Sequence, residues 1–281
     1  MKSNKSFVII VLSLALIFSC IAAIPTIIVD PFFHYHKPLK CFYYELTAPN
    51  QRNLNNGIIR HFNYNAIITG TSMTENFKAS EADKIFNVTS IKIPFFGGGY
   101  KEINDNLKVA FKHNKNINVV IRGLDIGYLA AEKDFTYYDK KKYPYYINNS
   151  NPFDDVQYLF NSDLLHLSLK MILAAYKENK NGITDFDHYS YWMPGKMFGK
   201  EAVLGGRNSF EQPKEFIEFT EEDRKNIIEN IEQNVTSLAR KYPESTFYYF
   251  ITPFSAVWWG IVKEVGNLDR QLEIEKIAIE N

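Results

Sequence analysis

The stretch that decides the fold is Asn65-Ala-Ile-Ile-Thr-Gly-Thr-Ser-Met-Thr-Glu-Asn-Phe77. Its first part, Ala66 to Thr69, is short, apolar and partly β-branched, which is typical of a buried parallel strand. Gly70 then allows a sharp turn into a helix. Thr71 or Ser72 can cap that helix, whose Glu75 lies at capping-box spacing. Free N–H groups and the positive helix end would then stabilise an oxyanion at Ser72, although a serine that only caps the helix is the alternative interpretation.

The motif Gly70-Thr71-Ser72 resembles the first block of the SGNH/GDSL hydrolase superfamily, in which a strand precedes Gly-Asp-Ser or a variant and the serine is the nucleophile. The longer stretch from Asn56-Gly-Ile-Ile-Arg-His-Phe62 to Phe77 looks like a membrane-anchored Firmicutes branch of that superfamily. This branch is distantly similar to the protein that assists D-alanylation of teichoic acids. With later blocks, the resemblance covers roughly residues 30–281. It implies a flavodoxin-like three-layer α/β/α domain with a parallel sheet.

The N-terminus predicts a membrane anchor. Phe7 to Val29 contains no charged side chain and would span ~35 Å as a helix, at ~1.5 Å per residue, which is enough to cross a bilayer. A cleaved signal peptide is the alternative, but the apolar run is too long for its hydrophobic region. The flanking lysines orient the helix weakly, and the resemblance implies that the domain lies outside the cytoplasm at the cell membrane.

Composition narrows the classes of partner. The chain of 281 residues has a net charge of zero, so nothing indicates a nucleic-acid partner. The two cysteines, Cys20 and Cys41, predict no intramolecular disulfide framework, because Cys20 lies in the apolar span. His34 and His36 could hold a metal, but the aromatic residues around them fit a membrane-interface belt better. We predict no metal and no organic cofactor.

Apolar runs alternate with amphipathic stretches along the chain, which is typical of a βαβ sheet. The predicted strands are Ala66–Thr69, Ser90–Ile93, Asn118–Leu124 and Thr246–Thr252. The predicted helices are Glu75–Phe86, Tyr100–His113, Ser162–Tyr176, Glu221–Lys241, Ser255–Glu264 and Asp269–Glu280. We divide the chain into a cytoplasmic tip and anchor (1–29), a juxtamembrane linker (30–63) and an α/β domain (64–281).

That domain carries an insertion at about residues 126–245. Its Tyr, Trp and Asn side chains, among them Tyr145 and Trp192, suit stacking on sugars and hydrogen bonding to hydroxyls. A well-packed irregular segment explains them equally well.

Gly97, Gly98 and Gly99 follow the second strand and offer N–H groups that no β-carbon obstructs. A tight turn is the alternative explanation. The superfamily's second block carries an oxyanion glycine at this place, so the resemblance implies an oxyanion hole formed by Ser72 with Gly97 or Gly98.

Asp125 ends the third strand, at the edge where open α/β sheets build their sites. The superfamily usually presents an asparagine there as a further oxyanion donor, whereas an ionised aspartate would repel an oxyanion. We therefore expect Asp125 to orient a substrate hydroxyl or a loop. Arg122 is a second candidate for orienting the substrate, and a structural ion pair between Arg122 and Asp125 is the alternative.

The base is the missing part of the site. The superfamily's Asp-x-x-His block comes near the C-terminus, and none follows Ser72 here. His188, in Asp185-Phe-Asp-His188, is the candidate base because it has a nearby carboxylate and a loop position. The charged amphipathic ending has no terminating signal and would leave an apolar helix face uncovered, so we infer that the sequence lacks the final strand and the catalytic Asp and His.

The resemblance implies a membrane-anchored serine esterase or O-acyltransferase with acyl-serine chemistry at Ser72. Its acceptor would be a cell-envelope polysaccharide or a teichoic-acid-like polymer. The lipid bilayer would be a partner through the N-terminal helix, and a membrane acyltransferase would be another. The alternative is a non-catalytic envelope scaffold or a polysaccharide-binding protein.

Overall fold

The structure is a computed structural model, and it describes residues 2–44, 51–137, 144–149, 151–178, 182–183, 187, 189–190 and 199–281. The chain divides into two compact units. Unit 1 comprises Met1–Phe62 and Tyr143–Asp185, and unit 2 comprises Asn63–Lys142 and Phe186–Asn281. The predicted linker and part of the predicted insertion therefore belong to the same unit as the N-terminal helix.

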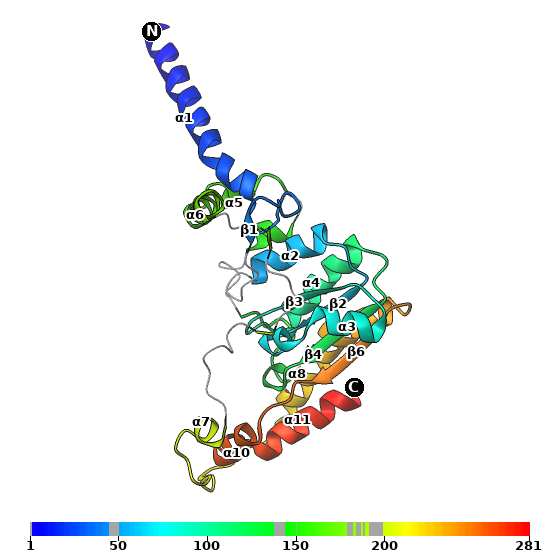
Figure 1. Cartoon of the computed structure of the whole chain (residues 1–281). Coiled ribbons are helices and arrows are strands. Elements are labelled where there is room, and N and C mark those ends of the chain that lie inside the picture. Colours follow the sequence, from blue (N-terminus) through cyan, green and yellow to red (C-terminus); the bar gives the residue numbers. More distant parts are fainter. Residues whose placement is uncertain are drawn as a thin grey trace. The chain divides into compact units, whose positions relative to one another are not determined.

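Unit 2 is built on a parallel four-stranded sheet with the strand order β3-β2-β4-β6 (Figure 1). The strands are β2 (Ala66–Gly70), β3 (Ser90–Pro94), β4 (Val119–Leu124) and β6 (Thr246–Ile251). Every residue of the central strands β2 and β4 is buried, as expected for a parallel sheet that is covered on both faces. The four predicted strands and the mixed α/β class are confirmed.

Helices cover both faces of this sheet. The helices of unit 2 are α3 (Ala79–Phe86), α4 (Tyr100–His113), α7 (Lys200–Leu204), α8 (Glu221–Ile231), α9 (Ser237–Lys241), α10 (Ala256–Glu264) and α11 (Leu268–Glu280). Ile121 and Leu124 of β4 lie on opposite faces because side chains alternate along a strand. Ile121 belongs to an apolar cluster with α3, whereas Leu124 belongs to one with α8, α11 and the first residue of α4.

The segment after β2 differs from the helix predicted over Glu75–Phe86. A short 3-10 helix, η2 (Ser72–Asn76), comes first, and α3 starts only at Ala79. No side chain caps η2, and Thr71 donates its hydroxyl hydrogen bond to Asp125 instead. The predicted capping box and α-helix dipole at Ser72 are therefore wrong.

The long helix predicted over Glu221–Lys241 is present with one irregularity. It begins at a capping box between Thr220 and Asp223, and it continues from α8 through a π-helical turn (Glu232–Thr236) into α9. A π turn changes the main-chain hydrogen-bond pattern. Its carbonyl groups accept side-chain hydrogen bonds from three other elements: Asn104 to Gln233, Arg122 to Asn234 and Tyr249 to Val235.

The C-terminal helix α11 is covered by α8. Ile274 and Ile277 are each 2% exposed and belong to the same apolar cluster as α8. Arg270 makes a two-pronged ion pair with Asp223, with distances of 2.9 Å from Nε and 2.6 Å from Nη2. The expectation of an uncovered apolar face on this helix is therefore wrong.

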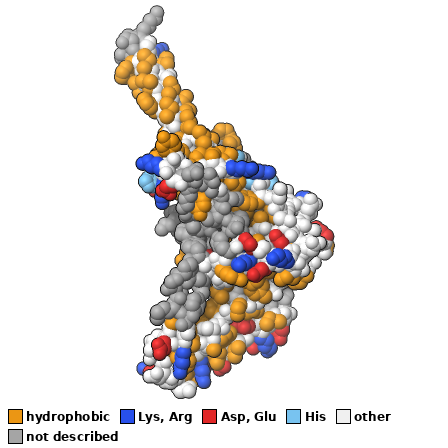
Figure 2. Space-filling model, viewed as in Figure 1, with side chains coloured by type: hydrophobic (Ala, Val, Ile, Leu, Met, Phe, Trp, Pro, Cys, Tyr) orange, Lys and Arg blue, Asp and Glu red, His pale blue; other side chains and the backbone are white. Residues whose placement is uncertain are grey.

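Unit 1 gathers a membrane-length helix with segments from two parts of the chain. Its elements are α1 (Lys2–Val29), β1 (Tyr43–Tyr44), α2 (Gln51–His61), η4 (Tyr145–Asn148), α5 (Val156–Leu159), α6 (Ser162–Glu178) and β5 (Gly182–Ile183). Lys5–Val29 is long and apolar enough to cross a membrane, and Figure 2 shows its hydrophobic side chains. The predicted irregular linker instead contains α2, whose Ile58 and Ile59 are buried.

The turn after α1 is organised around the fully buried carboxylate of Asp30. This carboxylate accepts hydrogen bonds from the N–H groups of His34, Tyr35 and His36 and from the Tyr158 hydroxyl. Asp30 itself has a φ of +46°, a left-handed conformation that these four hydrogen bonds hold in place. The chain therefore leaves α1 in a fixed direction.

His36 binds the C-terminal end of α1. Its Nε2 lies 3.0 Å from the Ile27 carbonyl oxygen, and its Nδ1 lies 2.7 Å from the Lys37 carbonyl oxygen. Because carbonyl groups only accept hydrogen bonds, both ring nitrogens must donate, which favours the imidazolium. Partial burial lowers the pKa of His36, but these hydrogen bonds and the charge of Asp30 together raise it above the ordinary value.

A raised pKa in the folded state means that protonated His36 stabilises unit 1. The stabilisation is fully present below about pH 6.5 and is lost as the pH rises through the folded-state pKa. An NMR titration of the histidine rings in the full chain should show one pKa above the ordinary value, and His36→Gln should remove that signal. A His36 pKa at or below the ordinary value would contradict this expectation.

Candidate active site

The predicted nucleophile lies at the carboxyl end of β2, near the middle of the sheet. The chain passes from β2 to β3 on one side and then returns across β2 to β4 on the other. Ligands bind open α/β sheets in the crevice at such a switch point, outside the carboxyl ends of the strands. The loops that follow β2, β3 and β4 all start at this edge.

Two glycines shape the turn that carries Ser72. Gly70 has a φ of +150°, and a β-carbon there would lie 2.5 Å from Cγ2 of Thr74. A β-carbon on Gly123 of β4 would lie 2.8 Å from the same methyl group. Thr74 is fully buried in this space, and its hydroxyl donates to the Thr71 carbonyl at 2.7 Å. The turn can therefore fold tightly onto the strand ends while Ser72 stays partly exposed.

The Ser72 hydroxyl has no hydrogen-bond partner in the described part of the chain. It is not a helix cap, because Thr71 holds the N-cap position of η2 and no side chain caps this helix. The main-chain N–H of Ser72 also lacks an acceptor among the described residues. A free hydroxyl beside free main-chain donors is an arrangement that acyl transfer requires.

Hydrogen bonds join the loops after β2 and β4. Thr71 Oγ1 donates to Asp125 Oδ2 at 2.9 Å, and the Gly127 N–H donates to Asp125 Oδ1 at 3.0 Å. The main-chain carbonyl of Asp125 accepts from the Tyr100 hydroxyl at 2.9 Å. Asp125 therefore orients loops in this structure, next to Ser72, and its carboxylate binds Thr71 rather than Arg122.

The loop after β3 keeps one of its three glycine N–H groups free. The Gly98 N–H donates to the Phe95 carbonyl at 2.9 Å in a tight turn that has Gly97 at a φ of +61°. The Gly99 N–H donates to Glu102 Oε2 at 3.0 Å. The Gly97 N–H has no acceptor among the residues that the structure describes. Of the predicted glycine donors, Gly98 is therefore already engaged and Gly97 is available.

Aromatic side chains enclose Gly97. The Tyr128 hydroxyl donates to the Gly97 carbonyl at 3.2 Å, which connects the loops after β3 and β4. A β-carbon on Gly97 would lie 3.0 Å from the ring of Tyr137, so this ring lies directly over the glycine. Any larger residue at position 97 would displace the ring and strain the positive φ.

Arg122 is buried behind this edge and cannot contact a substrate, so its predicted role in orienting a substrate is wrong. The side chain is 1% exposed, and its guanidinium donates to the carbonyl groups of Asn234 and Tyr100. It also lies 5.5 Å from the centre of the Tyr100 ring. Burial lowers the pKa of Arg122 to about 10, so the group stays charged at neutral pH. Arg122 thus ties β4 to the π turn that follows α8.

The candidate base His188 lies outside the described residues. Its neighbours on both sides contact the segment that starts at Ser72: Asp187 accepts from the Ser80 N–H at 3.0 Å, and Ser190 donates to the Asn76 side chain at 2.7 Å. His113 ends α4, which starts beside the carboxyl edge of the sheet and runs towards the opposite edge. The described part of unit 2 therefore holds no histidine beside Ser72.

Known proteins add no independent support for this site. No family model matches the chain, and no curated protein or solved structure matches it. The resemblance to the SGNH/GDSL superfamily therefore stays a prediction that rests on Gly70-Thr71-Ser72 and the surrounding stretch.

Three residues that build this edge are absent from the predicted set, namely Glu102, Tyr100 and Tyr128. Glu102 has a local signal, because it lies three residues after Gly99 and this is the capping-box spacing. The two tyrosines carry no such signal, since the chain has 18 tyrosines and their spacing does not distinguish these two.

Proposed function

We propose that this chain is a membrane-anchored, extracytoplasmic serine esterase or O-acyltransferase that acts on cell-envelope glycopolymers. The observation that carries the proposal is the free, partly exposed hydroxyl of Ser72 at the switch point, with the free N–H groups of Ser72 and Gly97 at the same edge. The strand order β3-β2-β4-β6 corresponds to the first four strands of the 2-1-3-4-5 order of flavodoxin-like sheets, which supports an SGNH-type fold.

The chemistry would proceed through an acyl-serine intermediate. Ser72 Oγ attacks the carbonyl carbon of an ester while a base takes the hydroxyl proton. The carbonyl oxygen becomes an oxyanion, which the N–H groups of Ser72 and Gly97 stabilise. Collapse expels the alcohol, which takes the proton from the base, and leaves an ester on Ser72. Water then releases a carboxylic acid, or an acceptor hydroxyl receives the acyl group as a new ester.

We assign the role of base to His188 because Asp187 and Ser190 bind the residues that follow Ser72.

The apolar helix α1 would anchor the enzyme in the cell membrane. The glycopolymer substrate and a membrane acyltransferase partner come from the resemblance, and the aromatic residues of the predicted insertion suit a sugar polymer.

Fluorophosphonate labelling of the full chain tests the proposal. We expect one covalent adduct on the peptide that contains Ser72, and Ser72→Ala should abolish it, because only an activated serine attacks this phosphorus centre. Ser255→Ala is the matched control, since the hydroxyl of Ser255 caps α10 by accepting from the Trp258 N–H. Labelling of this control should be unchanged. His188→Gln should slow labelling by about 10²–10⁴-fold if His188 is the base.

A folded chain that takes no label at Ser72 would refute the enzymatic proposal. That result would favour a non-catalytic envelope scaffold or a polysaccharide-binding protein. The absence of a histidine beside Ser72 in the described part of unit 2 makes this the second candidate function. Polysaccharide binding that survives Ser72→Ala but is lost in Tyr145→Ala would support it.

A further inference from the structure

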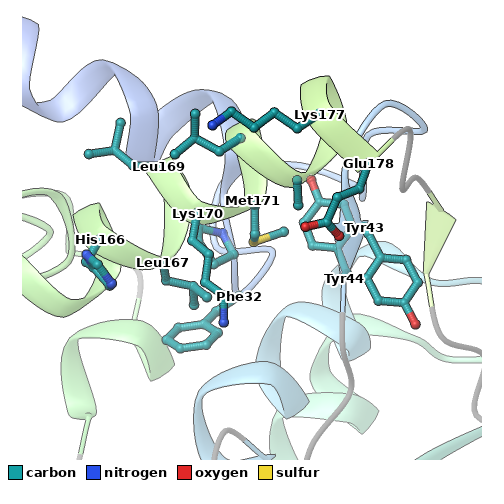
Figure 3. A pocket seen from close by; sticks show the side chains of 13 residues that line it. Phe32, Tyr43, Tyr44, His166, Leu167, Leu169, Lys170, Met171, Lys177 and Glu178 are labelled. Carbon is teal, nitrogen blue, oxygen red and sulfur yellow. The ribbon is translucent and has the colours of Figure 1, made fainter.

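A groove of about 570 Å³ lies between α6 and the segment that follows α1 (Figure 3). Its apolar lining includes Phe32, Tyr44, Leu167 and Met171. Its basic and acidic side chains are His166, Lys170, Lys177 and Glu178. The volume falls in the range of sites that hold a small organic molecule, and an apolar lining with a few polar groups is typical of such sites.

The groove is fixed to the end of the membrane-length helix. α6 packs against α1, and Ala23, Thr26 and Val29 are buried near the end of a helix that is otherwise largely exposed. Tyr44, which lines the groove, donates its hydroxyl to the Val29 carbonyl at 2.7 Å. If α1 spans a bilayer, the groove therefore lies at the level where acyl chains give way to headgroups.

The exposed side chains of α6 are of the kinds found at the boundary between acyl chains and headgroups. Leu169, Leu173 and Tyr176 are 44%, 53% and 87% exposed, and their spacing of four and three residues places them on one face. Leu169 and Leu173 also line the groove, so this face borders it. Lys170 and Lys177 are exposed beside this stripe. Helices with an apolar face bordered by basic residues lie in the membrane interface, and tyrosine is enriched at headgroup level.

Further exposed apolar side chains lie just before α6. They are Phe153, Val156 and Phe160. Val156 is the first residue of α5 and Phe160 directly follows α5, and this helix contacts both α1 and α6. Hydrophobic side chains cover α1 and the surface at its base in Figure 2. The apolar surface of the membrane-length helix therefore continues onto α5 and α6 around the groove.

The charges in the groove are separated along its length. Lys170 points from α6 towards Phe32, whereas Glu178 lies beside Tyr43 at the other end (Figure 3). Lys177 lies seven residues after Lys170, and its side chain extends along the other side of α6 from the Lys170 ammonium (Figure 3). Two lysines against one glutamate give the groove a net positive charge, which complements a phosphate group.

We propose that this groove binds an anionic phospholipid. An acyl chain would lie against Phe32 and Met171, the phosphate would bind Lys170, and Lys177 would add positive charge at the headgroup level. The exposed face of α6 would lie in the same leaflet. This inference rests on the proposed anchoring by α1 and is independent of the chemistry at Ser72.

Native mass spectrometry of the full chain, reconstituted with equal amounts of phosphatidylglycerol and phosphatidylcholine, tests the lipid preference. The wild type should retain phosphatidylglycerol in preference, by roughly fivefold for each lysine involved. Lys170→Gln/Lys177→Gln should lose this preference. Lys225→Gln/Lys263→Gln is the matched control, because it makes the same change in net charge at two exposed lysines of unit 2. Equal retention of both lipids by the wild type and the Lys170/Lys177 variant would overturn the proposal.

Fluorescence quenching at two labelled positions tests separately whether α6 contacts lipid and whether α1 is inserted in the membrane. With Cys20 and Cys41 replaced by serine, a fluorophore is attached at Tyr176→Cys, which lies outside the groove lining, or at Leu14→Cys in α1. Nitroxide lipids are added as quenchers. Both positions should be quenched. Quenching at position 14 alone overturns the inference and leaves the anchor intact, whereas quenching at neither position overturns both.

Discussion

Arg122→Ala should lower the free energy of unfolding of unit 2 by about 3–5 kcal/mol. The substitution empties the volume of a large, fully buried side chain on the face of β4 that meets the π turn. It also leaves the carbonyl groups of Asn234 and Tyr100 without their donor. Arg122→Lys should recover part of the loss, because an ammonium group keeps the charge but lacks the planar fork that reaches both carbonyls.

Tryptophan fluorescence during denaturation measures this effect in unit 2, because Trp258 and Trp259 belong to α10 of that unit. Arg224→Ala is the control. Its side chain is 42% exposed, its ion pairs are long, at 3.6 Å to Glu221 and 3.9 Å to Glu273, and its guanidinium lies 5.3 Å from the centre of the Phe219 ring. Its removal should therefore cost only about 1 kcal/mol. If both variants unfold at the same denaturant concentration, Arg122 does not tie the sheet to the π turn.

Gly57→Ala should destabilise unit 1 by about 3 kcal/mol, at the upper end of the usual cost of overpacking. A β-carbon on Gly57 would overlap the Phe32 carbonyl oxygen and would lie 2.7 Å from that of Phe33. Both oxygens belong to the main chain of the turn that Asp30 holds, so neither can rotate away as a side chain would. The clash must therefore be relieved by separating α2 from this turn.

Hydrogen exchange of the amides in Gln51–His61 measures this separation. Gly57→Ala should increase their exchange rates strongly. Gly205→Ala is the control. A β-carbon on Gly205 would have no atom within 4 Å, so the only cost of this substitution is the strain of its positive φ of +57°. It should cost only about 1 kcal/mol. Unchanged protection of α2 in Gly57→Ala would contradict the close approach between this helix and the turn.

The strands of the unit 2 sheet could be predicted because each strand is indicated by a short run of neighbouring residues. Buried parallel strands appear as short continuous apolar runs, and all four runs form strands. The turn after β2 could not be predicted, since it depends on Gly123 of another strand, which makes room for Thr74. α2 was missed because its asparagines favour turns, whereas burial of Ile58 and Ile59 within unit 1 stabilises the helix.

The candidate site, too, could be predicted from the sequence only in part. Strand order brings Ser72, Gly97 and Asp125 to one edge, and this follows from parallel strands whose loops start at their carboxyl ends. The occupied N–H of Gly98 depends on a turn type that three consecutive glycines do not specify. Arg122 lies on the face of β4 that meets the π turn after α8, and the sequence of a doubly buried strand does not indicate which face a residue occupies.

The interleaving of the two units along the chain delays contacts within each unit during synthesis. α1 emerges from the ribosome long before α6, its packing partner, and β2, β3 and β4 are made in between. Loop closure over so many residues makes unit 1 late to form. A chain arrested before residue 162 would therefore hold Phe32 and Tyr44 without the helix that completes their groove, and its β4 would still lack the neighbouring strand β6.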